Sequence, residues 1–207
     1  MEIFMENQAS KRKELKYVFE LKDYTVFKRI IMENGYRKNH SKNFVNNLYF
    51  DKDLSSFNEN IEGISERTKY RFRWYDKQEI FLEEKIKKAG IGFKNRRPTG
   101  FHRIEDIDLS IYKKLKGLNP VVQNRYLREY FINLKGIRIT LDSIIKFKQP
   151  NSLRVVNSNL NIMEIKYSIE NQPDKKLLNS LNLKLTKYSK YVNGYELICN
   201  KYDITKR

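Results

Sequence analysis

The sequence predicts an α+β protein built on an antiparallel sheet or barrel, and three observations support this. Charged and apolar residues alternate in several segments. In residues 69–75, Lys69, Arg71 and Arg73 fall on one face of a strand. Short polar turns at 76–78 and 135–136 separate pairs of such segments, as is typical of hairpins. Segments with helical spacing lie between the strands and at the C-terminal end.

The first half of the chain alternates predicted strands and helices. Residues 12–20 carry charge at every second position, which predicts a strand. Residues 23–34 have an apolar stripe at helical spacing, with Asp23 as an expected N-cap and Gly35 as a stop. The other elements expected here are an extended segment at 43–51, a short helix near 53–61 closed by Gly63, and hairpin strands at 67–76 and 79–88.

The second half begins with a segment rich in structure breakers. Residues 89–101 contain three Gly, one Pro and several bases, which predicts a mobile basic loop. Residues 104–116 are expected to be helical. The other elements expected here are hairpin strands at 125–134 and 137–147, a strand at 160–168, and helices at 174–183 and 189–201. No repeat or linker is visible, so we expect one domain over residues 1–207.

The composition narrows the class of protein. Lys and Arg number 42 against 25 Asp and Glu, which gives a formal charge of +17. A solvated Lys-rich surface would explain about half of this excess, and an anionic partner would explain the rest. Nucleic acid, an anionic membrane surface and polyphosphate all qualify. The 13% of aromatic residues exclude a disordered basic tail.

The same composition bears on location. A single Cys199 excludes an internal disulfide and fits a reducing cytoplasm. No apolar run approaches the roughly 20 residues of a membrane span. Residues 1–13 have no apolar core, so we expect no signal peptide and a cytoplasmic protein.

The shared parity of the charged residues suggests a function. If the sheet curls with its polar face inward, it forms a cationic tunnel that suits a polyanion. Eight segments follow one another in a characteristic order: RKELKY (12–17), LYFD (48–51), KYRFRWY (69–75), EEK (83–85), YLREY (126–130), RITLD (138–142), MEIK (163–166) and KYSKY (187–191). Together they resemble the VTC (vacuolar transporter chaperone) polyphosphate polymerase domain, within the CYTH / triphosphate tunnel metalloenzyme superfamily, over roughly residues 12–200.

The resemblance implies an antiparallel eight-stranded β-barrel tunnel with flanking helices and a C-terminal helix. It also implies transfer of the γ-phosphate of ATP to a growing polyphosphate chain, with a divalent metal, Mn²⁺ or Mg²⁺. The implied catalytic residues are Lys16, Arg71, Arg73, Lys85, Arg128 and Arg138. Further implied phosphate-binding residues are Lys87, Tyr126, Lys187, Ser189, Lys190 and Arg97. Glu164 falls on the implied metal position, with Glu14 as a second ligand or as an orienting partner for Lys16.

The match also has departures. CYTH members typically open with two acids before the lysine, whereas this chain has Arg12 at the first of these positions. That substitution favours the VTC type over cyclases and thiamine triphosphatases. The regulatory domain and membrane helices of eukaryotic VTC polymerases are missing here, so regulation and translocation of the product are not implied.

Several of these residues also have plain structural interpretations. Arg71 and Arg73 could pair with Glu83 across a strand pair, and Glu164 could neutralise a neighbouring lysine. Asp51 could cap the helix that follows it, and Ser189 could cap the last helix. Asp142 is expected to pair with a base, while His40 and His102 receive no role.

Three functions are therefore open: a polyphosphate polymerase, a tunnel triphosphatase that hydrolyses inorganic or nucleoside triphosphate, and a noncatalytic module that binds polyphosphate or RNA. RNA readers usually place aromatics beside their bases. Here Tyr70, Phe72 and Trp74 lie opposite the arginines, which counts against base stacking. No Gly-rich phosphate loop or kinase motif is present. We expect no DNA partner, and the sequence leaves the oligomeric state open.

Overall fold

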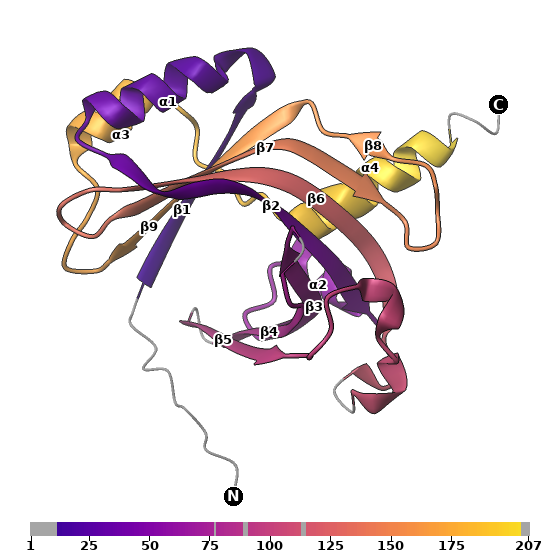
Figure 1. Ribbon diagram of the computed structural model, residues 1–207. Helices are drawn as coiled ribbons and strands as arrows, with labels where there is room; N and C mark the ends of the chain where they lie inside the picture. Colours follow the sequence, from indigo (N-terminus) through magenta and orange to yellow (C-terminus); the bar gives the residue numbers. More distant parts are fainter. Residues whose placement is uncertain (1–11, 77, 89–90, 113–114, 204–207) are drawn as a thin grey trace, which may run out of the picture.

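The fold is one curled antiparallel sheet with helices on both of its faces (Figure 1). The computed structural model describes residues 12–76, 78–88, 91–112 and 115–203, with residues 12, 91 and 201–203 described by backbone alone. Within this part of the chain, the strand order is β1-β9-β7-β6-β2-β3-β4-β5, and β8 pairs with β7. The α+β class and the antiparallel sheet predicted from the sequence are confirmed.

The elements agree with most of the predicted ones to within a few residues. The strands are β1 Arg12–Glu20, β2 Arg37–Asp51, β3 Arg67–Tyr75, β4 Phe81–Lys88, β5 Ile91–Pro98, β6 Asn119–Ile132, β7 Arg138–Lys148, β8 Val156–Asn157 and β9 Leu160–Ser168. The helices are α1 Tyr24–Glu33, α2 Ser55–Ile61, α3 Lys175–Leu181 and α4 Lys190–Asp203. Gly35 and Gly63 end α1 and α2 with positive φ, as expected. The stretch examined for a signal peptide, residues 1–11, lies outside the described residues.

Two predicted elements were wrong. Residues 91–98 are not a loop but the edge strand β5, paired along its length with β4. An edge strand tolerates Gly92 in its interior and Pro98 at its end, so these breakers did not prevent pairing. Residues 104–116 are not a helix but contain the two 3₁₀ turns η2 Ile104–Asp106 and η3 Leu109–Ile111. Asp108 accepts a hydrogen bond from the Ser110 N–H, a local bond that competes with helix formation.

Two smaller expectations also failed. The strand β2 begins at Arg37 rather than at residue 43. Asp23 makes no side-chain cap for α1, because it ends the 3₁₀ turn η1 Leu21–Asp23 that runs directly into the helix.

The convex face of the sheet carries two apolar clusters. Tyr17, Ile139 and Met163 belong to the first cluster, which α1 and α3 cover (Figure 1). Phe72 and Leu82 belong to the second, which residues 101–118 cover. Strand alternation therefore turns the polar residues of β1, β3, β4, β7 and β9 to the concave face.

A third apolar cluster fills one part of the concave face. Val45 and Tyr126 of the sheet pack there against Tyr191 and Val192 of α4. The rest of the concave face is lined with charged residues. Among the described residues, no helix is long and apolar enough to cross a bilayer.

The helix α4 packs closely on β7 at Gly194. A Cβ atom built on Gly194 would lie 2.5 Å from Cδ1 of Phe147, whose side chain is 1% exposed. We therefore expect Gly194→Ala to lower the free energy of unfolding by about 1–3 kcal/mol, because overpacking outweighs the gain in helix propensity. Chemical denaturation would measure this.

Gly92→Ala is the matched control, because a Cβ atom there would have no neighbour within 4 Å. We expect it to change stability by less than about 0.5 kcal/mol. Equal stability of Gly194→Ala and the wild-type protein would show that α4 does not pack against Phe147 as described.

Candidate functional site

The concave face brings charged residues from seven strands and one helix together. Cross-strand register places them on one side of the sheet, as in the pairs Lys16–Glu164, Arg128–Asp142 and Arg71–Glu83. The cations on this face are Lys16, Arg67, Lys69, Arg71, Arg73, Lys85, Lys87, Lys94, Arg96, Arg128, Arg138, Lys166 and Lys190. The carboxylates that pair with them are Glu14, Glu83, Asp142 and Glu164. Phe72 lies on the opposite face, fully buried.

The first charge cluster surrounds Glu83 of β4, whose side chain is 1% exposed. Oε2 of Glu83 accepts from Nε (2.9 Å) and Nη2 (2.6 Å) of Arg71, and Arg73 lies 3.7 Å away. Lys94 Nζ lies 2.6 Å and Arg96 Nε 3.8 Å from Oε1. Burial alone would raise the pKa of Glu83, but the coulombic attraction of Arg71 and Arg73 outweighs it and holds the pKa well below its ordinary value.

The structural interpretation of Arg71, in which it pairs with Glu83 across two strands, is confirmed. The arginine does pair with Glu83, but the pair lies on the concave face and not on an exposed surface. Arg73 donates in addition to Asn47 Oδ1 (2.8 Å) and to the Tyr126 hydroxyl (3.3 Å). These bonds fix both guanidinium groups in one orientation, which is how phosphate sites are preorganised.

The second charge cluster surrounds Asp142 and Glu164. Arg128 donates to both oxygens of Asp142 (2.6 and 2.7 Å), and Lys190 Nζ of α4 lies 2.5 Å from the same carboxylate. Glu164 lies 3.2 Å from Lys166 and 3.6 Å from Lys16. Burial would raise the pKa of Glu164, but Lys166 and Lys16 lower it well below its ordinary value. Asp142 thus pairs with bases, as expected.

The two carboxylates implied as metal ligands face each other across one lysine. Lys16 Nζ lies 2.9 Å from Glu14 and 3.6 Å from Glu164. Both carboxylates have lowered pKa values, so they are ionised oxygen donors of the kind that Mg²⁺ and Mn²⁺ prefer. No group of three acidic, His or Cys side chains with metal geometry occurs within the described ranges. The two carboxylates suit a hard divalent ion in charge and in donor atom, and they would supply only part of its coordination shell.

A third group of cations has no carboxylate partner. Lys69 of β3, Lys85 of β4 and Lys94 of β5 stand in one row across three strands, and Arg67 stands opposite Lys87. Lys94 reaches Glu83. Lys69, Lys85 and Lys87 have no carboxylate within ion-pair distance in the described part of the chain. Like charges placed directly opposite each other destabilise a sheet. We refer to Arg67, Lys69, Lys85 and Lys87 as the unpaired cation patch.

The remaining predicted residues divide between the concave face and other positions. Lys190 and Tyr126 lie inside, with Lys190 Nζ 4.7 Å from the centroid of the Tyr126 ring. Arg138 is exposed and stands opposite Lys166 at the end of the same face. Ser189 caps α4: its Oγ accepts weakly from the Val192 N–H (3.5 Å) and its own N–H donates to Asn193.

The structure does not bring two predicted phosphate ligands to the concave face. Arg97 stands opposite Leu82, whose side chain belongs to a convex cluster, so Arg97 points away from the channel. Its neighbours Lys94 and Arg96 take the inward positions. Lys187 is exposed, ahead of α4, and forms no hydrogen bond or ion pair with the charge clusters among the described residues.

Sequence reasoning missed some residues of the concave face. Lys69 has the same parity as Arg71, and Lys166 the same as Glu164, so alternation alone could have identified both. Lys94 and Arg96 were lost because their strand was interpreted as a loop. Lys190 was expected from the family resemblance alone, because it reaches the site from a helix, where the period-two pattern does not apply.

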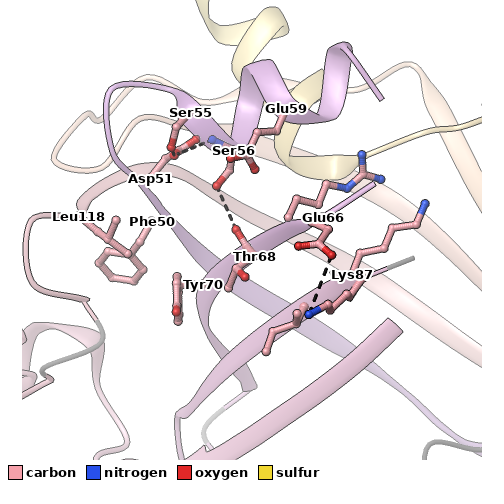
Figure 2. Close-up of a pocket in the computed structure, with 13 residues that line it drawn as sticks. Phe50, Asp51, Ser55, Ser56, Glu59, Glu66, Thr68, Tyr70, Lys87 and Leu118 are labelled. Atoms are coloured by element: carbon pink, nitrogen blue, oxygen red, sulfur yellow. Dashed lines mark hydrogen bonds and ion pairs between the residues drawn. The ribbon is translucent and has the colours of Figure 1, made fainter. Parts of the chain in front are cut away.

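A hollow lies beside α2, next to the unpaired cation patch, whose Arg67 and Lys87 are among its lining residues (Figure 2). Its volume is about 360 Å³, and Thr68, Tyr70, Ser56 and Glu59 are among the residues that line it. Figure 2 shows how α2 is fixed above β3, since the Ser56 hydroxyl donates to the Thr68 carbonyl (3.1 Å). This anchoring positions the neighbouring side chain of Asn60 over the unpaired cation patch.

Comparisons with known proteins agree with this geometry. The family model described as the VTC domain matches residues 11–108 and 102–199, which confirms the resemblance found in the sequence. None of the curated proteins matches the chain significantly.

Three solved structures share the fold. The PH1819 protein of Pyrococcus horikoshii OT3 is 17% identical, with a TM-score of 0.51 over 95% of this chain and 99% of that chain. A putative adenylate cyclase from Vibrio parahaemolyticus is 12% identical, with a TM-score of 0.54 over 90% and 99%. A conserved hypothetical protein from Pyrococcus furiosus is 14% identical, with a TM-score of 0.54 over 90% and 99%.

The Glu83 cluster leads to a stability prediction. We expect Glu83→Gln to lower the free energy of unfolding at pH 7 by about 3 kcal/mol, because Arg71 and Arg73 lose a buried counter-charge. The folded pKa of Glu83 is depressed, so its contribution is present above its unfolded pKa and is lost as pH falls below about 4.5. The variant should therefore lose less stability than the wild type between about pH 5 and pH 3. Denaturant titrations at both pH values measure this.

Glu105→Gln serves as a control, since Glu105 is 68% exposed and pairs with Arg103 on the surface. Its effect should stay below about 0.5 kcal/mol. A Glu83→Gln variant with wild-type stability at pH 7 would contradict the central role of this carboxylate.

Proposed function

The chain belongs to the VTC domain family, and we propose that it is a metal-dependent polyphosphate polymerase. It would transfer the γ-phosphate of ATP to a polyphosphate chain on the concave face and release ADP. The residues that would hold the phosphates come from β1, β3, β4, β6, β7 and α4. The proposal combines family membership with the charges described above.

The observation that carries the proposal is the unpaired cation patch. Lys69 and Lys85 face each other without a carboxylate between them, although acids neutralise the two neighbouring clusters. Such an arrangement costs stability in the empty protein, and an extended polyanion would remove that cost. A phosphate chain fits because it carries a charge on every unit and needs no recognition of bases.

The chemical step needs little from the protein beyond position and charge. A terminal oxygen of the polyphosphate chain would attack the γ-phosphorus of ATP and form a new P–O bond. The bond from that phosphorus to the β,γ-bridging oxygen would break, and ADP would leave with the electron pair. Arg71, Arg73 and Arg128 would donate to non-bridging oxygens and stabilise the charge that spreads over them. No Ser, Cys or His nucleophile is required.

Glu164 and Glu14 would hold a divalent ion, Mn²⁺ or Mg²⁺, which would supply neutralisation of the phosphate charge when bound. Lys16 lies between these two carboxylates and would orient both. The tunnel triphosphatase differs only in the nucleophile, which would be water. A noncatalytic binder would use the same cations without turnover. The experiment below separates all three functions.

We predict that the purified protein, with ATP, Mn²⁺ and a short polyphosphate primer, lengthens the primer and releases ADP. Lys85→Ala should lower kcat/KM by roughly 10- to 100-fold, because one charge-assisted contact to phosphate is lost. The exposed Lys85 has no ion-pair partner in the described chain, so stability should change little. A polyphosphate-stained gel and an ADP assay give both products.

Lys135→Ala is the control, since Lys135 pairs with Asp174 on the outer surface and should leave turnover unchanged. Free phosphate and ADP without any longer chain would establish the triphosphatase instead. If neither product forms with any metal or primer while polyphosphate still binds, the protein is a binding module.

Glu164→Gln tests the metal ligand. We predict loss of metal-dependent turnover by at least about 100-fold while inorganic triphosphate still binds, because an amide is a poor ligand for a hard cation. Glu129→Gln is a matched control: its side chain is also 10% exposed, but it pairs with Lys28 on the convex side. Turnover rates over a Mn²⁺ titration would show the difference. Unchanged turnover and metal dependence in Glu164→Gln would mean that Glu164 only neutralises its neighbouring lysines.

A further inference from the structure

Lys69 is held differently from the other inward-facing cations. Its Nζ donates to Oδ1 of Asn60 (2.8 Å) and lies 5.5 Å from the centroid of the Tyr191 ring. Neither partner carries a negative charge, whereas Lys16 and Lys190 both contact carboxylates. The amide oxygen of Asn60 can accept a hydrogen bond from Lys69 in either protonation state, so this contact does not require the ammonium form.

The neutral acceptor is built into the fold. The carboxylate of Asp51 accepts from the N–H group of Ser56 (3.0 Å), a residue that Figure 2 shows beside it. The same carboxylate accepts from the N–H group of Phe57 (3.1 Å), and the two bonds secure the start of α2. It also accepts from the Tyr191 hydroxyl of α4. The carboxylate oxygens of Asp51 therefore accept hydrogen bonds from both helices, α2 and α4. Asn60, one turn further along α2, is placed over β3 as the hydrogen-bond partner of Lys69.

The charges that face Lys69 are mostly positive. Arg67 and Arg71 flank it on β3, Lys85 stands opposite on β4 with Lys94 beyond it on β5, and Lys16 approaches from β1. The carboxylate of Asp51 on β2 acts in the opposite direction and favours the ammonium form. Burial lowers the pKa of Lys69, and Arg67 and Lys85 lower it further, to about 7.

We propose that Lys69 is the proton-uptake residue of the channel: its amine takes a proton from solvent when a phosphate chain binds. The incoming phosphate oxygens reverse the local charge, so the ammonium form becomes favourable beside Asn60 and Tyr191. Binding of polyphosphate between about pH 7 and pH 8.5 would then consume a proton. The inference depends on the anion-binding part of the proposed function and not on turnover.

The test is calorimetric binding of inorganic triphosphate, without ATP or metal, in two buffers of different ionisation enthalpy at pH 8. Triphosphate itself exchanges protons, so the informative quantity is the difference between wild type and Lys69→Arg, which stays charged. We expect the wild type to take up between about 0.5 and 1 proton more than the variant. Between pH 7 and pH 8.5 the dissociation constant of the wild type should also rise by a factor up to about ten times larger than that of Lys69→Arg.

Lys69→Gln gives a second, independent measurement, since it cannot be protonated. Its dissociation constant should exceed the wild-type value at pH 6.5, and the difference between the two should narrow as the pH rises to 8.5. Lys87→Arg, in the same patch, should keep the wild-type proton uptake. Thermal unfolding of each variant confirms that it is folded.

Two results would overturn the inference in different ways. If triphosphate binds but proton uptake is the same in wild type and Lys69→Arg, Lys69 is charged throughout and the inference fails while the proposed function stands. If triphosphate does not bind the wild-type protein at all, both the anion-binding proposal and the inference fail.

Discussion

Charge neutralisation inside a curled sheet is the constraint on which the rest of this structure depends. The number of cations matters less than their position on a concave surface, where like charges lie close together and repel strongly. Glu83, Asp142 and Glu164 each hold several cations and make this concentration of charge possible. The apolar residues of the same strands then occupy the convex face, where helices and the 101–118 segment cover them.

Carboxylates neutralise some cations of the concave face and leave others unpaired. We interpret the paired cations as structural and the unpaired ones as available to a ligand. Where a carboxylate is buried among arginines, the cluster is complete by itself and orients side chains. Where Lys69 and Lys85 face each other, no carboxylate among the described residues pairs with them, and this is the place proposed for the anion. The protein thus combines rigid donors on one part of the concave face with an electrostatic vacancy on another, a combination suited to a substrate that moves along the surface.

Much of the fold and of the site follows from strand alternation in the sequence. Charged residues at every second position predicted the strands β1, β3, β7 and β9. The same alternation predicted that Arg71, Arg73 and Arg128 face inward. It failed where tertiary contacts outweigh local preference. The strand β5 forms because β4 offers it a pairing partner, although Gly92 and Pro98 resemble loop residues. Arg97 consequently points outward, since register decides the direction of a side chain and a one-residue error reverses it.

The two edges of the sheet have a consequence for association between molecules. In the described chain β1 and β5 each have a neighbour on one side only, so both present backbone groups that another strand could pair with. Lys94, Arg96 and Arg97 crowd the β5 edge with positive charge. A second copy approaching this edge meets repulsion that weakens as ionic strength rises. The positive charges of this strand therefore also oppose edge-to-edge aggregation, most effectively in dilute salt.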